Sequence, residues 1–215
     1  MMTRVILIRH GITDWNKKKR YCGYKDVNLS RDGKLEVVKL RKSLKDIIFD
    51  KIYCSDRKRA LQTKAILFGS RGFTKVKGLR EINFGVFEGL RHDEIMEKYP
   101  KVYRKWLVNP YKIRVPRAES MQVFKKRVKD AIKKILCFNR GKTIAVVCHG
   151  GVIGVFVSSI LKSNNFWGYV PSSASVTIVE YKYNKYRIDK FNNKTYRFRD
   201  GSQAKGKVSP IRGTV

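Results

Sequence analysis

An apolar run that ends in Arg-His-Gly constrains the fold of this chain more than any other feature. Residues Val5 to Ile8 are apolar, and Arg9, His10 and Gly11 follow immediately. A short apolar run bounded by a turn residue predicts a strand buried on both faces, as in a parallel sheet. Open α/β sheets place their chemistry where such strands end. The run therefore predicts an α/β fold with functional groups at the end of this strand.

The side chains at this strand end suit phosphate chemistry. Arg9 keeps its positive charge and offers a planar fork of donors that matches a phosphate group. The same charge disfavours a protonated imidazole, so His10 is expected to stay neutral and able to attack as a nucleophile. Gly11 lets the backbone turn sharply beside a ligand. Considered alone, a histidine in the position of His10 is more often a hydrogen-bonded structural residue than a nucleophile.

A second stretch repeats this pattern far along the chain. Thr143 to Cys148 forms an apolar run, and His149, Gly150 and Gly151 follow it. The chain contains only three histidines, and two of them stand directly after a predicted strand. The repetition favours one shared site over two unrelated structural histidines.

Four blocks of the sequence resemble the histidine phosphatase superfamily, which includes cofactor-dependent phosphoglycerate mutases and many small phosphatases. The blocks are Arg9 to Asn16, Cys54 to Thr63, Leu79 to Gly89 and His149-Gly150. They stand in the order that the family has, and together they cover roughly residues 4 to 180. Each block alone is a weak signal, but the ordered set is specific.

The resemblance implies a three-layer α/β/α sandwich with a mostly parallel central sheet, as in phosphoglycerate mutase-like proteins. It implies that His10 attacks phosphorus and becomes phosphohistidine, and that Glu81 protonates the leaving alcohol. Arg9, Arg59 and His149 would stabilise the transferred phosphoryl group. The substrate-binding residues carried over are Arg9, Asn16, Arg20, Cys22, Gly23, Arg59, Glu81 and Gly150. This scheme requires no metal and no cofactor, and its partner is a small phosphorylated metabolite.

Some positions near these blocks leave alternatives open. Cys22 stands where Gln or Ser is commoner in the family. Arg57 lies at the start of a predicted helix that Ser55 or Asp56 would cap, and it is either a second substrate contact or simply exposed. Glu88 belongs to the block that carries the acid, but it is predicted to be structural.

Phosphatase activity is favoured over mutase activity. The chain is shorter than a typical cofactor-dependent mutase and lacks the Arg-Pro-Pro-Pro segment of that branch. The run from Glu81 to Ser120 most resembles bacterial alpha-ribazole phosphatases of cobalamin synthesis, although Arg117 and Ala118 replace two glycines common in the phosphatase branch. The alternatives are a cofactor-dependent phosphoglycerate mutase, a broad-specificity sugar-phosphate phosphatase and a non-catalytic basic binding module.

The formal net charge is +32, from 49 Lys and Arg against 17 Asp and Glu. Such a charge could attract nucleic acid or an anionic membrane. The basic residues are scattered through every segment without a nucleic-acid-binding motif, which argues against nucleic acid as a partner. Oligomerisation is left open.

The four cysteines show no C-x-x-C pairing, no apolar run approaches the roughly 20 residues that span a bilayer, and no secretory signal precedes the first strand. A cytoplasmic location is therefore expected.

One domain is expected over residues 1–198, with a lid-like insertion at about residues 90–120 and a disordered tail at 199–215. Amphipathic helices are predicted after the turn at Ser30, a suitable N-cap, and from Ser120 onward. The apolar faces assigned to these helices are Leu35, Val38, Leu40, Leu44 and Ile48 in the first, and Val123, Phe124, Val128, Ile132 and Ile135 in the second. Within the insertion, helices are predicted over residues 92–99 and 103–107, with Pro100 between them.

Overall fold

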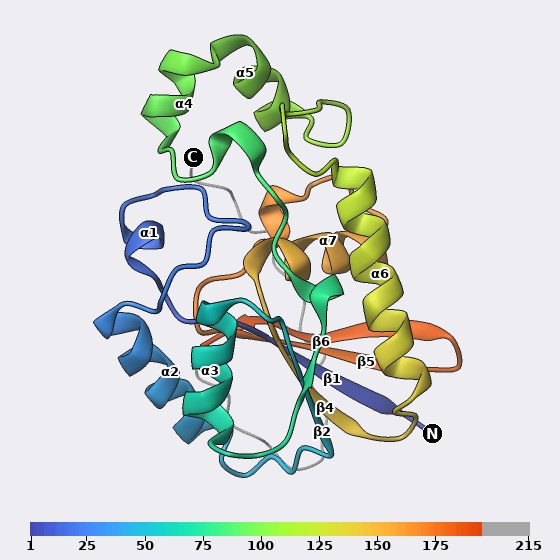
Figure 1. The fold of residues 1–215 in the computed structure, drawn as a ribbon. Coiled ribbons are helices and arrows are strands. Elements are labelled where there is room, and N and C mark those ends of the chain that lie inside the picture. Colours follow the sequence, from blue (N-terminus) through green and yellow to red (C-terminus); the bar gives the residue numbers. More distant parts are fainter. Residues whose placement is uncertain (195–215) are drawn as a thin grey trace.

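The computed structural model describes residues 1–194, so the predicted tail at 199–215 lies outside the described residues. Its centre is a six-stranded sheet in the order β3-β2-β4-β1-β5-β6 (Figure 1). The strands are β1 (Thr3–Arg9), β2 (Lys51–Cys54), β3 (Thr74–Lys75), β4 (Thr143–Cys148), β5 (Val176–Lys182) and β6 (Lys185–Asn193). Within this sheet β5 alone runs opposite to the other strands, which confirms a mostly parallel sheet.

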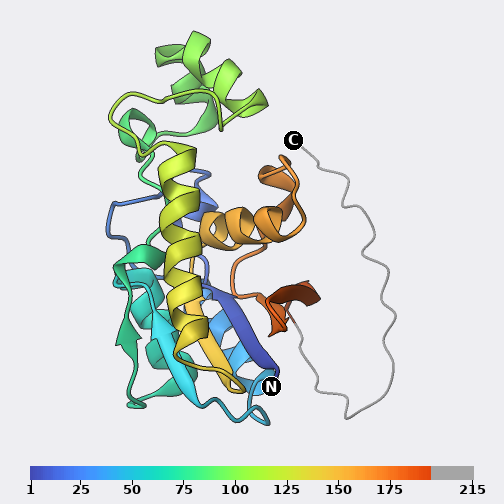
Figure 2. The same cartoon turned by 90° about the vertical axis from the view of Figure 1, so that its right-hand side faces the viewer.

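Helices cover both faces of the sheet, because side chains alternate along the central strand β1. Val5 and Leu7 pack with α6 (Met121–Cys137) and α7 (Gly150–Ile160). Ile6 and Ile8 point to the other face and pack with α2 (Arg31–Ser43) and α3 (Lys58–Phe68). Figures 1 and 2 show the three resulting layers, which confirm the expected α/β/α sandwich.

The predicted N-cap of α2 is confirmed, and its predicted buried face is right for Leu40 and Leu44 but wrong for Leu35, Val38 and Ile48. The Ser30 hydroxyl accepts a hydrogen bond from the Gly33 N–H at 3.0 Å. The side chains that turn inward are Val37, Leu40 and Leu44, whereas Leu35, Val38 and Ile48 are exposed by 55%, 42% and 85%. Gly33 sets this orientation, since a Cβ there would lie 2.0 Å from the Ile12 carbonyl oxygen. Positions 33, 37, 40 and 44 form one helical stripe, and that stripe faces the sheet.

The predicted face of α6 needs one correction. Phe124, Val128, Ile132 and Ile135 are buried as expected, but Val123 is 57% exposed. Met121 takes its place in the core. Spacing of three or four residues from Phe124 does not reach Val123, which therefore faces away from the sheet.

The 90–120 segment forms a separate layer beyond one end of the sandwich (Figure 2). It contains α4 (His92–Lys98) and α5 (Pro100–Val108). The predicted break at Pro100 is confirmed, although α5 begins at Pro100 itself and not at Tyr103. Proline suits the first turn of a helix, where its missing N–H has no partner to lose.

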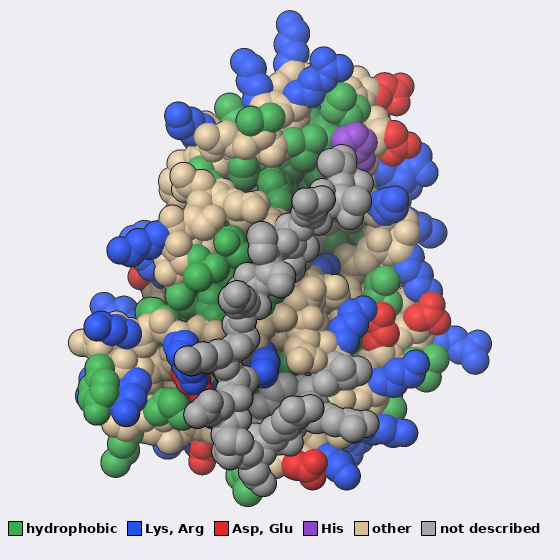
Figure 3. All heavy atoms as spheres, turned by 180° about the vertical axis from the view of Figure 1, so that it is seen from behind, with side chains coloured by type: hydrophobic (Ala, Val, Ile, Leu, Met, Phe, Trp, Pro, Cys, Tyr) green, Lys and Arg blue, Asp and Glu red, His purple; other side chains and the backbone are tan. Residues whose placement is uncertain are grey.

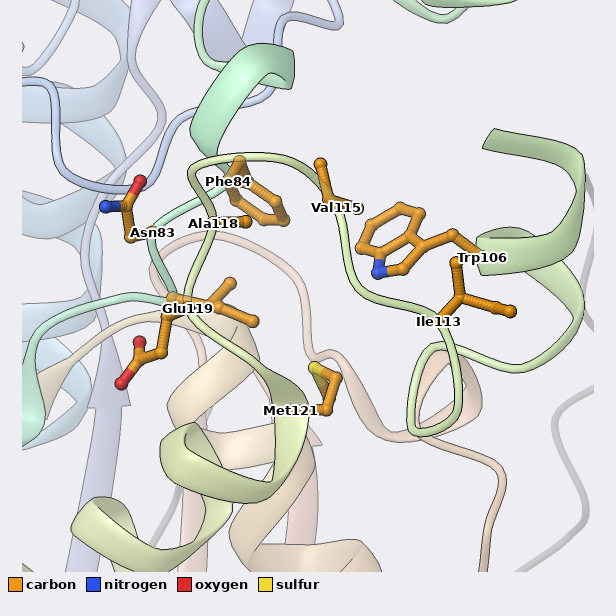
Figure 4. Close-up of a pocket in the computed structure, with 9 residues that line it drawn as sticks. Asn83, Phe84, Trp106, Ile113, Val115, Ala118, Glu119 and Met121 are labelled. Carbon is orange, nitrogen blue, oxygen red and sulfur yellow. The ribbon is translucent and has the colours of Figure 1, made fainter. Parts of the chain in front are cut away.

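An aromatic core holds this segment together. Its buried members are Phe87, Ile95, Tyr103, Trp106 and Val115. A cavity of only about 10 Å³ lies between this core and the start of α6. Figure 4 shows Phe84, Val115 and Trp106 around that cavity, with Asn83 and Glu119 on the side away from the indole. The cavity has room for about one water molecule, so it is a packing defect and not a ligand pocket.

Candidate active site

The ends of three parallel strands bring the site together. β1 and β4 are neighbours in register from Arg4↔Thr143 to Arg9↔Cys148, so His10 and His149 follow at the same edge of the sheet. Their ring centroids are 5.2 Å apart in a T-shaped arrangement. β2 pairs with the other side of β4 and leads through Ser55 into α3, which carries Arg59. The predicted meeting of the two histidines is therefore confirmed.

His10 is held in one tautomer, with its Nε2 directed at Arg59. Its Nδ1 lies 2.8 Å from the Gly11 carbonyl oxygen, which can only accept a hydrogen bond, so Nδ1 carries the hydrogen. Nε2 then carries the lone pair, and it accepts a hydrogen bond from Arg59 Nε at 3.2 Å. Burial, followed by the charges of Arg59 and Arg9, holds the pKa of His10 well below its usual value. The imidazole is therefore neutral at neutral pH.

Arg59 is a fully buried guanidinium wrapped by main-chain carbonyls. Its Nη2 donates to Gly23 O at 2.8 Å and to Cys22 O at 3.3 Å, and its Nη1 donates to Lys25 O at 3.1 Å. The Nε bond to His10 is its fourth, which leaves one Nη1 hydrogen of its five donors for a ligand. The loop at residues 22–25 therefore fixes Arg59 against the nucleophile.

Arg9 and Gly150 lie against each other beside the histidines. Arg9 Nη1 donates to the Pro171 carbonyl, and Arg9 Nε is buried without a hydrogen-bond partner in the described part of the chain. A Cβ on Gly150 would come within 3.1 Å of the Arg9 guanidinium carbon. The glycine thus leaves the space in which Arg9 lies.

His149 depends on a residue that the sequence does not reveal. Its Nε2 lies 2.8 Å from Ser55 Oγ, and its Nδ1 is buried with no partner within residues 1–194. The Ser55 hydroxyl accepts from the Arg57 N–H at 3.4 Å, and its own hydrogen can be donated to Nε2. In that arrangement His149 carries its hydrogen on Nδ1. Burial, followed by the Arg59 charge, lowers the pKa of His149 well below its usual value.

Glu81 is a buried carboxyl group beside these bases, 8% exposed. Its Oε2 accepts from the Gly151 N–H and its Oε1 from the Ile82 N–H, both at 2.9 Å. Burial raises the pKa of Glu81 against the opposing pull of these two hydrogen bonds and of Arg59 and Arg9. A Cβ on Gly151 would lie 2.2 Å from Glu81 Oε1, so the second glycine of the pair is required for this contact. A carboxyl group with a raised pKa is suited to donate a proton.

Arg127, on α6, holds the segment that carries Glu81. Its Nη1 donates to the carbonyls of Gly78 and Arg80, at 3.0 and 2.7 Å. Its Nη2 donates to the Glu81 carbonyl at 2.9 Å and to Glu119 at 2.7 Å, and its Nε donates to Glu119 at 2.6 Å. All five guanidinium donors are therefore used. Sequence reasoning missed this residue, because nothing local marks it.

The remaining predicted binding residues lie around this centre in different ways. Gly23 contributes its carbonyl to Arg59, and a Cβ there would lie 1.9 Å from Ile82 O. Cys22 also contributes its carbonyl, while burial raises the pKa of its thiol to about 11. Asn16 Oδ1 accepts from the N–H and hydroxyl of Thr13, which is the N-cap residue of α1 (Asp14–Lys17), and so closes the capping box of that helix.

Arg20 is committed to the 90–120 segment. Its Nη1 donates to Gly89 O at 2.6 Å and to Glu94 at 2.9 Å. Glu88 accepts from the N–H groups of Gly23 and Tyr24, at 3.1 and 2.7 Å, which confirms that it is structural. Among the predicted residues, the structure gathers Arg9, His10, Arg59, Glu81, His149 and Gly150 most closely.

Residues 1–194 contain neither a metal-binding cluster nor a membrane-spanning helix. No group of three or more His, Cys, Asp or Glu side chains is placed there to hold a metal ion. No helix in that range is long and apolar enough to cross a bilayer. Figure 3 shows the Lys and Arg side chains around the whole outline of one face, not gathered in one patch.

An α/β/α sandwich with a neutral histidine, two arginines and a buried carboxyl group at one sheet edge defines a class of enzymes that transfer phosphoryl groups through histidine. The family comparison agrees: residues 5–194 match the model of the histidine phosphatase superfamily (branch 1), and the chain belongs to that family. Its members include phosphatases, and phosphatase activity is supported for this chain.

Individual relatives differ in what their names say they act on. Phosphoserine phosphatase 1 of Hydrogenobacter thermophilus is 29% identical over 195 residues, which cover 89% of this chain and 92% of that protein. Phosphoglycerate mutase-like protein 4 of Arabidopsis thaliana is 31% identical over 154 residues, covering 69% and 67%. The crystal structure of alpha-ribazole phosphatase from Shigella flexneri matches with a TM-score of 0.82 and 23% identity, covering 92% of this chain and 100% of that chain. The last of these likenesses concerns the fold alone.

Proposed function

We propose that this chain hydrolyses phosphomonoesters of small metabolites with His10 as the nucleophile. The observation that carries the proposal is the fixed tautomer of His10, whose Nδ1–H is held by Gly11 O and whose Nε2 lone pair faces Arg59. A neutral imidazole can attack phosphorus without first losing a proton. The raised pKa of Glu81 supplies the matching acid.

The reaction proceeds in two steps. In the first, the His10 Nε2 lone pair forms a bond to phosphorus, the ester P–O bond breaks, and the leaving oxygen takes the proton of Glu81. In the second, the Glu81 carboxylate takes a proton from water, the hydroxyl oxygen bonds to phosphorus, and the P–N bond breaks. Inorganic phosphate leaves, and His10 and Glu81 return to their starting protonation states.

Donors around the phosphoryl group would stabilise its charge in both steps. Arg59 has one Nη1 hydrogen to give, and Arg9 has its buried Nε–H. The Nδ1–H of His149 is also unpartnered within residues 1–194. Asn16 can add its amide hydrogens, because only its oxygen is engaged by Thr13.

Two substrates come first for testing. Alpha-ribazole 5′-phosphate is favoured by the run from Glu81 to Ser120, and phosphoserine is favoured by the relative named phosphoserine phosphatase 1. We also propose that residues 1–198 form one catalytic domain with the 90–120 segment as its lid. The packing of Trp106 on Trp167, at 4.9 Å between ring centroids, supports a lid that reaches the pocket side. A cytoplasmic location and the absence of a nucleic-acid partner remain parts of the proposal.

The test is phosphate release in EDTA from alpha-ribazole 5′-phosphate, phosphoserine and a panel of sugar phosphates, beside a mutase assay on 3-phosphoglycerate. His10→Ala is expected to abolish release, whereas His92→Gln, which changes the third histidine, is expected to keep it. Alkaline quenching during turnover should trap a phosphorylated His10, because the P–N bond of phosphohistidine survives in base and hydrolyses in acid. Isomerisation of 3-phosphoglycerate without phosphate release would make the protein a mutase. Full activity of folded His10→Ala would overturn the assignment of the nucleophile.

A further inference from the structure

One guanidinium beside the site has no hydrogen-bond acceptor within residues 1–194. Arg57 lies over the ring of Tyr24, with its guanidinium carbon 4.7 Å from the ring centroid. It is the N-cap residue of α3, two residues before Arg59. Tyr24 directly follows Gly23, whose carbonyl binds Arg59. Arg57 and Tyr24 therefore flank the phosphate-binding arginine from the helix side and from the loop side.

A second guanidinium lies near the same ring but is already neutralised. Arg80, which directly precedes Glu81, lies 5.8 Å from the Tyr24 centroid. It donates through Nε to Asp56 at 2.7 Å and through Nη2 to the other oxygen of that carboxylate. The hydrogen bond from Arg80 is the main cause that lowers the pKa of Asp56, so the carboxylate is ionised and committed to Arg80.

Arg57 has no such partner within the described residues. Its Nε is buried and makes no hydrogen bond there. Buried polar groups in proteins are nearly always hydrogen-bonded, so an unpaired one calls for an explanation. Stacking on a tyrosine ring fixes the plane of a guanidinium and leaves its in-plane N–H groups free. The Arg57 guanidinium is thus held in one orientation, and its N–H groups have no acceptor within the described residues.

The carboxylates near Arg57 are engaged by other groups. Asp56 pairs with Arg80, and Asp26 accepts a hydrogen bond from the Lys58 N–H at 2.8 Å, so within residues 1–194 neither carboxylate binds the Arg57 guanidinium. A guanidinium fork matches the two oxygens of a carboxylate in a bidentate pair. The catalytic donors already account for the phosphoryl group, so this acceptor belongs to another part of the substrate.

We propose that Arg57, oriented by Tyr24, binds a carboxylate carried by the substrate beside its phosphate ester. The inference rests on the proposed function and names its substrate class: phosphorylated hydroxy acids and amino acids. Phosphoserine belongs to this class. Alpha-ribazole 5′-phosphate does not, because it carries no second anionic group. Arg57 is a specificity residue in this scheme and takes no part in bond making.

The experiment compares pairs of esters that differ in the carboxylate. Phosphoserine is paired with phosphoethanolamine, and 3-phosphoglycerate with glycerol 3-phosphate. The readout is the preference, the ratio of kcat/KM for the acid to kcat/KM for its partner. The wild type is expected to prefer the acid at least tenfold, since a charge-assisted bidentate pair is worth roughly tenfold to a hundredfold in binding. Arg57→Gln is expected to lower that preference about tenfold or more, chiefly through KM for the acid.

Matched variants distinguish bidentate binding by the Arg57 guanidinium from a general effect of positive charge. Lys58→Gln removes the same charge from the neighbouring, exposed residue, and it should change the preference less than about twofold. Arg57→Lys keeps the charge without the fork and should fall between the wild type and Arg57→Gln. Tyr24→Phe keeps the ring that orients Arg57, so the preference for the acid should be unchanged. Tyr24→Leu removes the ring and should lower that preference in part. The tyrosine pair still tests the subsite if Arg57 variants fold poorly.

Each outcome has a distinct meaning. An equal preference in the wild type and Arg57→Gln overturns the subsite and leaves the proposed function standing. An equal fall in Lys58→Gln and Arg57→Gln also overturns it, since long-range attraction then accounts for the preference. If folded wild-type protein releases phosphate from none of the four esters, alpha-ribazole 5′-phosphate or the sugar-phosphate panel, the proposed function fails and the subsite fails with it.

Discussion

The catalytic pocket and the 90–120 segment are held together by different forces. In the pocket, main-chain groups hold the ionisable side chains: Gly11 O binds His10, Gly23 O binds Arg59, and the Gly151 N–H binds Glu81. In the aromatic core, rings pack edge to face, with Phe87 and Tyr103 centroids 5.3 Å apart. The contrast indicates that catalysis depends on the positions of main-chain groups, and few substitutions can reproduce those positions. The segment above it depends on side-chain packing, which many sequences can satisfy.

Removing the acid should cause the largest effect in the pocket. Glu81→Gln is expected to lower kcat on alkyl phosphates by about 10²- to 10⁴-fold, because the leaving oxygen loses its proton donor. The pKa of Glu81 is raised, so wild-type kcat should fall as the pH rises through that pKa, and the variant should lack this fall. The loss should be much smaller on p-nitrophenyl phosphate, whose leaving group needs no proton. Equal losses on both ester types would contradict the assignment.

Breaking the aromatic core should affect stability more than chemistry. Trp106→Ala is expected to cost about 3 kcal/mol in the free energy of unfolding, since it removes a buried ring with several aromatic neighbours. Urea denaturation measures this cost, and Leu35→Ala, on an exposed leucine, should stay within about 0.5 kcal/mol of the wild type. Turnover of p-nitrophenyl phosphate at low temperature should fall only a few-fold. A loss as large as that of Glu81→Gln would show that the two regions are not separable.

The buried histidines should make folding stability depend on pH. The pKa values of His10 and His149 are lowered in the folded state, so below about pH 6.5 only the unfolded chain takes up their protons. Stability is therefore complete above that pH and is lost as the pH falls, by up to about 1.4 kcal/mol per pH unit for each histidine. Glu81 opposes this trend, because its raised pKa favours the folded state at lower pH. Urea denaturation from pH 7 to 5.5 should give a shallower slope for His149→Gln than for the wild type or His92→Gln.

The serine that holds His149 should give the smallest effect. Ser55→Ala removes the hydrogen bond at Nε2 and frees the tautomer of His149, which is expected to lower kcat about tenfold. Ser158→Ala is the matched control, because Ser158 is also buried but donates to the Val155 carbonyl within α7. Steady-state kinetics of both variants decide the point. Equal kcat values for the two would remove Ser55 from the site.

Local sequence patterns were enough to predict the two histidines of the site, but not the residues that hold the site in place. The histidines after Val5–Ile8 and Thr143–Cys148 could be identified because strand, histidine and glycine are contiguous in the sequence. Arg59 and Glu81 were reached only through the family resemblance. Ser55 and Arg127 contact residues 94 and 46 to 49 positions away, and no local spacing records such a contact.

The sandwich was predicted correctly, but helix faces were not always. The 13-residue helix α2 carries apolar residues on two stripes, and periodicity alone could not choose between them. The choice came from Gly33, whose backbone lies against Ile12. That contact is tertiary, and it leaves Leu35 and Val38 in solvent. An apolar residue on the surface costs little, so the sequence is free to carry one.

The five hydrogen bonds of Arg127 limit how this protein can be recombined with its relatives. Gly78, Arg80, Glu81 and Glu119 are all held by this one side chain from α6. A chimera that takes residues 90–116 from a relative leaves this arrangement whole, so new segments can be grafted there to change substrate range. A chimera whose crossover lies between Glu119 and Arg127 would take the residue at position 127 from one parent and the groups that it binds from the other. Lysine at position 127 could bind only some of these acceptors. Residues 78–127 should therefore be transferred together in any chimera that carries Glu81, and only residues 90–116 within them can be exchanged.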